Sequence, residues 1–451
     1  MKINKKQKHK LAMFAGAAAL AALAPQVQAQ SSDALIDKLV DKGILTVDEA
    51  KDLRDQADND FKTALQAKTG MPDWVTSLKI GGDFRGRVDQ LNTMDTSHYT
   101  DRMRFRYRLR FGIVANMLDG LEAGFRLASG DYAQGSSNQG NPLSANSTMQ
   151  NNGTKKGLWI DTAYGKWTAV NNGDWLVAAT IGKMDNPFQF TPMVFDPDYT
   201  PEGGVVTGTY TITDIHSVAF AGGAFVLDEE SGSTQDPALY GGQVALNSKW
   251  NSKWASSLGA GYFSIGNPQQ LTTSNVPYQN QGNTRNAAGK LLDNYDPIIG
   301  DASATYTLDS FPLYPGAFPI KVQGEVMDNP DVNANNMGFW IGTTLGKSGT
   351  KGTWDLSYRY EYLEANAWYD QVVDDDMAVY YQHAPIAGST GAYGGTNVKG
   401  HFVKLNYSFT DALTLSFTTY LSDLVNPNLY GNVKEPNSQM IHFMADLMWK
   451  F

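Results

Sequence analysis

Residues 102–113 read Arg-Met-Arg-Phe-Arg-Tyr-Arg-Leu-Arg-Phe-Gly-Ile, and this stretch decides the fold class. Arginines alternate with apolar or aromatic residues through most of it. A period of two places the two sets on opposite faces of a β-strand. A soluble sandwich also alternates, but its charged face would meet bulk water. In a membrane barrel the apolar face meets lipid and the charged face meets a wet lumen, so the stretch indicates a transmembrane strand.

The same period appears on both sides of this stretch. In Leu78–Asp89 the even positions are apolar or small and the odd positions are polar or small. Residues 441–451 alternate in the same way and finish on Phe451. A strand with one apolar face would be a liability at an open sheet edge. We therefore expect it to pair with the first strand and to close a barrel. A terminal aromatic residue also resembles the signal by which outer-membrane barrels are recognised for assembly, and Phe451 is predicted to serve as this signal.

Short and long connections alternate along residues 74–451. Tight turns are predicted near Leu118–Gly120 and Asn171–Asp174, and later near Asp214, Asn251, Ser348 and Asp411. Long loops are predicted at about 130–157, 185–203, 228–237, 265–294, 328–336, 363–397 and 423–438. This alternation is typical of periplasmic turns and extracellular loops. The sequence therefore predicts an all-β fold, a transmembrane antiparallel β-barrel of about 16 strands over residues 74–451.

Two segments precede the predicted barrel. Residues 1–29 join five lysines to an apolar run and a small-residue cleavage motif, which is the layout of a secretory signal peptide. Residues 30–73 are expected to form a short periplasmic helical hairpin and a linker. Residues 46–49, Thr-Val-Asp-Glu, have the pattern of a capping box that starts the second helix. The hairpin is either a solvated spacer or a segment for oligomerisation or cell-wall docking.

Composition excludes several classes of protein. The formal net charge is −10, and it becomes −15 without residues 1–29, so nucleic-acid partners are not expected. There is no cysteine for a disulfide framework. The six histidines lack metal-ligand spacing and no nucleophile motif is evident, so we expect no metal, no cofactor and no enzymatic activity. The acidic run 374–376 is interpreted as a solvated loop, with a cation shared with lipopolysaccharide as the alternative.

Eight arginines determine the predicted chemistry of the pore. Their parity predicts that they project into the lumen and line one wall: Arg85, Arg87, Arg102, Arg104, Arg106, Arg108, Arg110 and Arg126. Guanidinium groups stay charged and suit carboxylates, phosphates and other oxyanions. In the alternative, they pair with inward acids such as Asp83, Asp89 and Glu122 and only brace the wall.

The third long loop, Asp185–Gly203, is the predicted constriction. It carries Asp185, Asp196, Asp198 and Glu202, and four prolines stiffen it. Acids that face the arginine wall would create a transverse field in a narrow, wet pore. The alternative is an external cap that packs on the barrel rim.

Several segments resemble the bacterial putative-porin family. They are the helical leader 34–46, the arginine strand 102–110, Trp159–Tyr164 and Gly182–Phe188, followed by Phe195–Gly203. The resemblance spans most of residues 30–451 and is strongest in 33–205. It implies a diffusion channel and supplies no solute.

The expected function is a passive outer-membrane porin for small hydrophilic solutes, with a possible anion preference. The alternative is a surface-binding or adhesion protein whose barrel is an anchor with a blocked lumen. The expected partners are outer-membrane lipid, lipopolysaccharide, the barrel-assembly machinery and further copies of the chain in a homotrimer.

Overall fold

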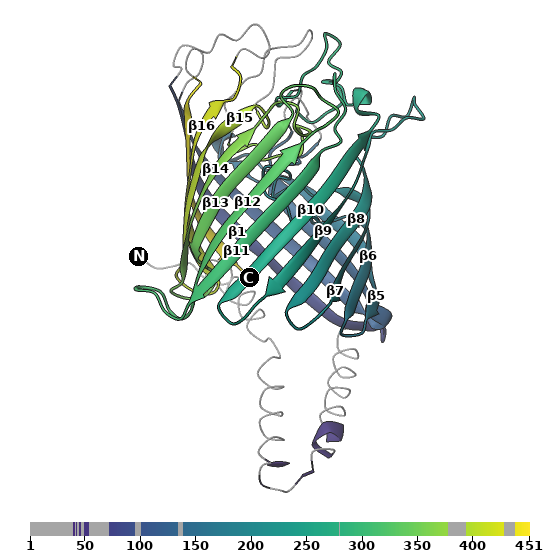
Figure 1. The fold of residues 1–451 in the computed structure, drawn as a ribbon, viewed down its shortest axis with the longest axis vertical. Coiled ribbons are helices and arrows are strands. Elements are labelled where there is room, and N and C mark those ends of the chain that lie inside the picture. The colour runs from purple at the N-terminus through teal and green to yellow at the C-terminus, as the bar shows by residue number, and fades with distance from the viewer. Residues whose placement is uncertain are drawn as a thin grey trace, which may run out of the picture. The chain divides into compact units, whose positions relative to one another are not determined.

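The computed structural model describes residues 39–40, 42, 45–46, 49–53, 72–94, 101–133, 139–278, 280–377, 394–427 and 438–451. The strands among these residues, from Val75 to Lys450, form one antiparallel sheet (Figure 1). Its strands are β1 (Val75–Thr93), β2 (Arg102–Met117), β3 (Leu121–Gly130), β4 (Ser147–Thr148), β5 (Gly157–Asn171), β6 (Trp175–Lys183), β7 (Glu202–Thr211), β8 (His216–Val226), β9 (Ala238–Lys249), β10 (Trp254–Gly266), β11 (Ile298–Leu308), β12 (Phe318–Asp328), β13 (Met337–Gly346), β14 (Trp354–Leu363), β15 (Val398–Ser408), β16 (Leu413–Leu424) and β17 (Met440–Lys450). Three short 3₁₀ turns accompany them: η1 (Leu118–Gly120), η2 (Asn151–Gly153) and η3 (Pro268–Gln270).

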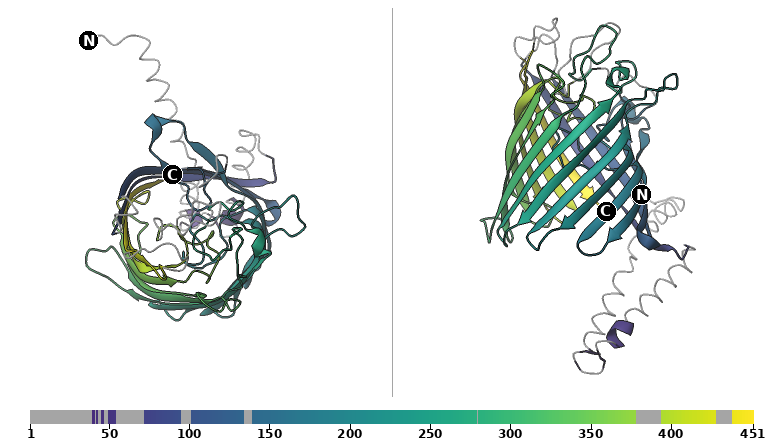
Figure 2. Two further views of the ribbon diagram at one scale, coloured as in Figure 1. Left: turned by 90° about the horizontal axis from the view of Figure 1, so that it is seen from above. Right: turned by 45° about the vertical axis from the view of Figure 1, so that its right-hand side comes forward.

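The sheet closes on itself. β1 pairs with β2 on one side and with β17 on the other, where Phe84 lies opposite Trp449. The two-residue strand β4 pairs with β2 and lies within the connection between β3 and β5. The other sixteen strands form the wall of the barrel, seen as a closed ring in Figure 2. The predicted closed antiparallel barrel of about 16 strands is confirmed.

The two faces of the strands differ as the period of two predicts. On β2, Phe105 is 50% exposed on the outer face, whereas its neighbour Arg106 is 8% exposed inside. Large apolar side chains are exposed on outward positions of many other strands, including Ile181 on β6 and Leu258 on β10. The exposed apolar surface of the barrel fits a lipid environment, because lipid contacts carry no desolvation cost for these side chains.

The connections alternate in length, as predicted. The strand ends leave short turns at residues 118–120, 172–174, 212–215, 250–253, 309–317, 347–353 and 409–412. Most of the connections at the other end of the barrel are longer, and we name two of them the 267–297 loop and the 364–397 loop after the residues that they span. The first tight turn requires positive φ angles, 59° at Asp119 and 73° at Gly120, as hairpins of this kind do.

The segment before the barrel is described only in short pieces. The predicted signal peptide, residues 1–29, and most of the predicted hairpin lie outside the described residues. Helical turns are present at 39–40 and 49–53. The capping box is confirmed, because Thr46 N donates to the Glu49 carboxylate (2.9 Å) and Glu49 N donates to Thr46 Oγ1 (3.2 Å). Within the described residues, no helix has the length and apolar character needed to cross a membrane.

Candidate functional site

The arginine wall comprises inward arginines of β1, β2 and β3. On β2, Arg106 and Arg108 are buried, and the apolar residues between them point outward. Arg102, at the first position of β2, is exposed. The other seven arginines of the predicted wall each have an aspartate within 4.0 Å. The structure thus brings the predicted residues together, and it pairs them with acids.

The middle of the wall is tied to the third long loop. Arg108 donates to Asp83 Oδ1 on β1 (Nη2, 3.0 Å) and to Asp198 Oδ1 in the loop (Nη1, 3.2 Å). Arg110 donates to Asp83 Oδ2 (Nε, 2.8 Å) and lies 3.9 Å from Asp198. A guanidinium fork can bind two carboxylates at once, so Arg108 joins the strand to the loop.

Asp89 is the most enclosed acid of the wall, with no exposed surface. Arg104 Nη2 lies 2.6 Å and Arg106 Nη1 lies 3.5 Å from its Oδ2 atom. His442 Nε2, on β17, lies 3.0 Å from Oδ1, and the other ring nitrogen of His442 lies 2.8 Å from the carbonyl oxygen of Asp376. Asp89 therefore joins two neighbouring strands and, through His442, the 364–397 loop.

The remaining arginines of the wall are paired in the same manner. Arg87 forms a bidentate ion pair with Asp446 on β17, in which Nε donates to Oδ1 (2.7 Å) and Nη2 donates to Oδ2 (2.8 Å). Arg85 donates to Asn146 Oδ1 (2.7 Å) and lies 3.8 Å from Asp446. On β3, Arg126 binds Asp161 of β5 and Asp185 of the third loop, the latter at 2.6 Å.

The third long loop, residues 184–201, crosses the interior of the barrel. It reaches the β2 wall through Asp198 and β9 through Gln189, whose N–H donates to Gln243 Oε1 (2.8 Å). Thr191 Oγ1 donates to Glu325 Oε1 on β12 (2.5 Å). The order of the strands places six strands between β2 and β12 on one side and eight on the other, so the loop contacts opposite walls. In the view from above in Figure 2, segments that connect the strands lie inside the ring.

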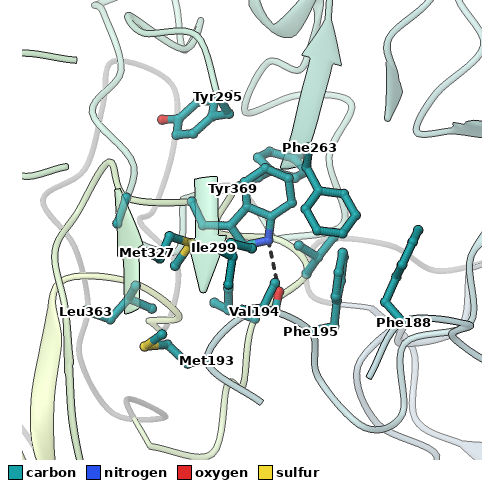
Figure 3. Close-up of a cluster of buried hydrophobic side chains, with 14 of the residues drawn as sticks. Phe188, Met193, Val194, Phe195, Phe263, Tyr295, Ile299, Met327, Leu363 and Tyr369 are labelled. Carbon is teal, nitrogen blue, oxygen red and sulfur yellow. Dashed lines mark hydrogen bonds between the residues drawn. The ribbon is translucent and has the colours of Figure 1, made fainter. Parts of the chain in front are cut away.

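Three inward loops share an apolar core, which we call the inner apolar cluster. It joins residues of the third loop, the 267–297 loop and the 364–397 loop to apolar side chains of the strands; among its members are Phe188, Met193, Val194, Phe195, Phe225, Phe263, Leu271, Leu291, Tyr295, Ile299, Met327, Leu363, Trp368, Tyr369, Val372 and Val373. In Figure 3, Phe188, Phe195 and Phe263 lie close together, and their ring centroids are 4.8 to 5.8 Å apart. Trp368 has no exposed surface, and its Nε1–H donates to the carbonyl oxygen of Val194 (2.9 Å).

The interpretation of residues 374–376 as a solvated acidic run is wrong for Asp374. This residue is 6% exposed, and its Oδ2 atom accepts a hydrogen bond from Arg359 of β14 (3.0 Å). The sequence around Asp374 contains apolar residues that indicate burial of this segment. Trp368, Val372 and Val373 make the loop too apolar for an outer surface, and their burial in the cluster draws the following acids inside.

The acids of the third loop differ in their surroundings. Asp185 and Asp198 pair with arginines, and Glu202 pairs with Lys183 (3.0 Å). Asp196 is 5% exposed and has no basic partner within 4.0 Å among the described residues. Burial, followed by the nearby charge of Asp375, holds the pKa of Asp196 well above its usual value.

A cavity of about 860 Å³ lies between the third loop and the short-turn end of β8–β12. Its lining is mainly neutral and polar and includes Gln189, Thr191, Gln243, Asn247, Ser303, Thr305 and Gln323. Its charged members are Asp214, Lys249, Lys253, Asp301, Lys321 and Glu325. None of the eight arginines of the predicted wall lines it. Sequence reasoning missed this lining, because hydroxyl and amide residues on weakly alternating strands carry no strong pattern.

Comparison with known proteins gives a family match and distant structural likenesses. Residues 90–291 match a family described as "Putative porin". The structure is similar to a porin of Rhodopseudomonas blastica in a triple mutant (11% identity, TM-score 0.41, 83% of this chain and 100% of that chain). It is also similar to OprB of Pseudomonas putida (11% identity, TM-score 0.48, 83% of this chain and 94% of that chain). No curated protein sequence matches the chain.

Proposed function

We infer that the chain is a porin of the bacterial outer membrane, because residues 90–291 match the putative porin family. Porins are non-enzymatic channels, so no reaction is assigned to the polar residues inside the barrel. We propose that the chain is a passive channel for small hydrophilic solutes. The observation that carries this proposal is the large polar cavity inside the barrel.

The lining of the cavity supports this choice of solute. Hydroxyl and amide groups can both donate and accept hydrogen bonds. A solute that sheds water on entering therefore finds replacement partners on the wall, and the cost of desolvation is offset. Three acidic and three basic side chains line the space, so their formal charges balance and neither sign of charge dominates the lining. We propose that solutes move along the β8–β12 side of the lumen.

We propose that the third long loop constricts this route. Its contacts with opposite walls support the role, since Asp198 is bound at β2 and Thr191 at β12. Asp185 and Glu202 are bound near its two ends by Arg126 and Lys183. A segment anchored at several points narrows a pore in a defined way, whereas a free loop would fluctuate.

An anion preference requires guanidinium charge that nearby carboxylates do not cancel. Among the described residues, the ion pairs of the arginine wall join seven of its arginines to seven aspartates. This balance favours the bracing role over a strongly anion-selective wall. We therefore propose that the wall holds the third loop in place and gives at most a weak preference for anions.

Single-channel recording in planar bilayers tests the proposed channel. We expect stable conductance steps from the purified protein and uptake of neutral polar solutes in a liposome swelling assay. The second candidate function, a barrel-anchored binding protein with a blocked lumen, is favoured by the inner apolar cluster. A correctly folded protein that conducts no ions and admits no solute would establish this second function.

Replacing Asp83 with Asn tests whether the wall contributes to selectivity. The change removes the carboxylate shared by Arg108 and Arg110 and leaves one uncompensated positive charge. A charge at close range in a wet pore is worth on the order of 1 kcal/mol or less, so we expect anion permeability to rise up to severalfold in dilute salt. The rise should shrink in molar salt, because screening shortens the reach of the charge.

The measurement for Asp83→Asn is the zero-current potential in a salt gradient. Asp119→Asn is the matched control, because Asp119 lies exposed in the first tight turn. An unchanged potential in folded Asp83→Asn would place the arginine wall away from the conducting route.

The assembly state of the barrel, the role of Phe451 and the location of residues 30–73 are proposed as well. We propose that the barrel assembles as a homotrimer surrounded by outer-membrane lipid and lipopolysaccharide, which native electrophoresis of the purified protein tests. Phe451 exchanges two backbone hydrogen bonds with Gly82 of β1 (2.9 and 3.1 Å), and its proposed role is recognition by the barrel-assembly machinery. We also propose that residues 30–73 lie in the periplasm.

A further inference from the structure

We propose that Asp196, Asp374 and Asp375 form a binding site for a divalent cation of the calcium class, which ties the third loop to the 364–397 loop inside the barrel. Each aspartate offers a carboxylate oxygen, and the three oxygens lie within 4.8 Å of one another. Calcium binds oxygen ligands at about 2.3–2.6 Å, so ligands on opposite sides of one ion are separated by about 5 Å. The spacing therefore suits a single shared ion.

The two loops hold the site together without help from an ion. Asp196 N donates to the carbonyl oxygen of Val372 (2.7 Å), and Asp374 N donates to the carbonyl oxygen of Pro192 (3.0 Å). These two backbone hydrogen bonds run in opposite directions between the loops and lie beside the carboxylates. The ligands are thus brought together by the fold, which lowers the ordering cost of binding.

The charges of the site are not balanced by the protein. Asp374 binds Arg359 (Nη2 to Oδ2, 3.0 Å). For Asp196 and Asp375, no ion pair with a described residue is present. Asp196 and Asp374 are buried and Asp375 is half-buried, and the three carboxylates share one guanidinium partner at ion-pair distance. Uncompensated buried charge is costly, and a bound divalent cation would neutralise it.

Burial and mutual repulsion act on all three carboxyl groups. Burial, followed by neighbouring aspartates, holds the pKa of Asp196 and that of Asp375 well above their usual values. The pKa of Asp374 is raised by burial, although Arg359 opposes the shift. A bound divalent cation would offset this mutual repulsion.

A buried hydroxyl from the 267–297 loop supplies an independent indication of a ligand. Tyr278 is 7% exposed, and its hydroxyl makes no hydrogen bond of normal geometry with a described residue. Tyr278 packs with Leu143 and Tyr199, and Tyr199 follows Asp196 by three residues, so the ring lies next to the third loop. Burial, then the charges of Asp375 and Asp196, raise the pKa of this phenol, and the side chain of Asn141 opposes the shift. Gln371 fixes the Tyr278 backbone through two hydrogen bonds (2.7 and 3.0 Å). The unpaired oxygen is a neutral donor of the kind that calcium accepts, directly or through water.

Metal binding is measured with calcium and with terbium as a luminescent probe. The protein is the full chain, refolded in detergent without lipopolysaccharide and treated with a chelator. We expect about one calcium ion per chain by titration calorimetry and terbium luminescence excited through nearby aromatic rings. The double variant Asp196→Asn, Asp375→Asn should bind calcium at least tenfold more weakly, because both carboxylates without a basic partner are removed.

Asp119→Asn is the control, since it removes an exposed acid of the first tight turn that lies outside the cluster. It should bind calcium as the unaltered protein does. Tyr278→Phe keeps all the carboxylates and provides a second test if the double variant does not fold; we expect a severalfold loss of calcium affinity. Equal calcium binding by the unaltered protein and the double variant would overturn the site. So would the absence of stoichiometric binding by the folded, unaltered protein.

The consequence for the pore rests on the proposed channel function, whereas the binding measurement does not. An ion that ties the loops together should reduce their motion, so chelation is expected to increase current noise in the unaltered protein and to leave the double variant unchanged. Binding without any conductance would retain the site and reject the channel. Conductance without calcium binding would reject the site and retain the channel.

Discussion

Replacing Trp368 with Ala is expected to release the inward loops and to raise both the single-channel conductance and its noise. The indole has no exposed surface, its ring packs against Phe195 and Phe263, and its N–H binds the carbonyl oxygen of Val194. Truncation of a buried Trp costs about 3–5 kcal/mol, because apolar contacts are lost and a cavity remains. The third loop and the 364–397 loop would lose a hydrogen bond and a ring contact that join them.

The effect of Trp368→Ala is measured by single-channel recording of the folded protein in a planar bilayer. Trp167→Ala is the matched control, because Trp167 is exposed on β5. Trp368→Phe should fall between the two, since it restores much of the volume without the hydrogen bond. If Trp368→Ala folds and conducts like the unaltered protein, the inner apolar cluster does not control the width of the pore.

Replacing Asp89 with Asn is expected to lower the free energy of unfolding by about 3–5 kcal/mol, the usual cost of removing one partner from a buried ion pair. Asn has nearly the same shape, so packing is preserved and the charge is lost. Arg104 and Arg106 would be left without their shared counter-ion, and His442 would lose a carboxylate partner. These groups are buried, so water cannot replace the lost interaction fully.

Denaturant titration of the barrel in lipid vesicles, followed by tryptophan fluorescence, measures the stability of Asp89→Asn. Asp309→Asn is the control, because it removes one aspartate from an exposed ion pair with Lys253 and should change stability little. Equal stability of Asp89→Asn and the unaltered protein would mean that the arginine wall is not braced through Asp89.

The strands could be predicted from the sequence because their signal is local. In 102–113 the alternation of arginine with apolar residues is enforced by two different solvents, lipid outside and water or polar groups inside, so it is written into neighbouring positions. Turn length is local as well, as the Asp119–Gly120 turn shows. The family resemblance, most of the loop positions, the capping box at Thr46 and the closing of the barrel through β17 were accessible for these reasons.

The partners of the arginines and the paths of the loops were decided by tertiary structure. Parity predicted that Arg108 points inward, but it could not show that Asp198, ninety residues later, would meet it. The hydrogen bond between Trp368 and Val194 joins residues 174 positions apart, and no pattern in either loop encodes that distance. The acids around Asp374 were misread for the same reason: burial depends on the packing of three loops against one another, whereas the alternation of a strand depends only on its own two faces.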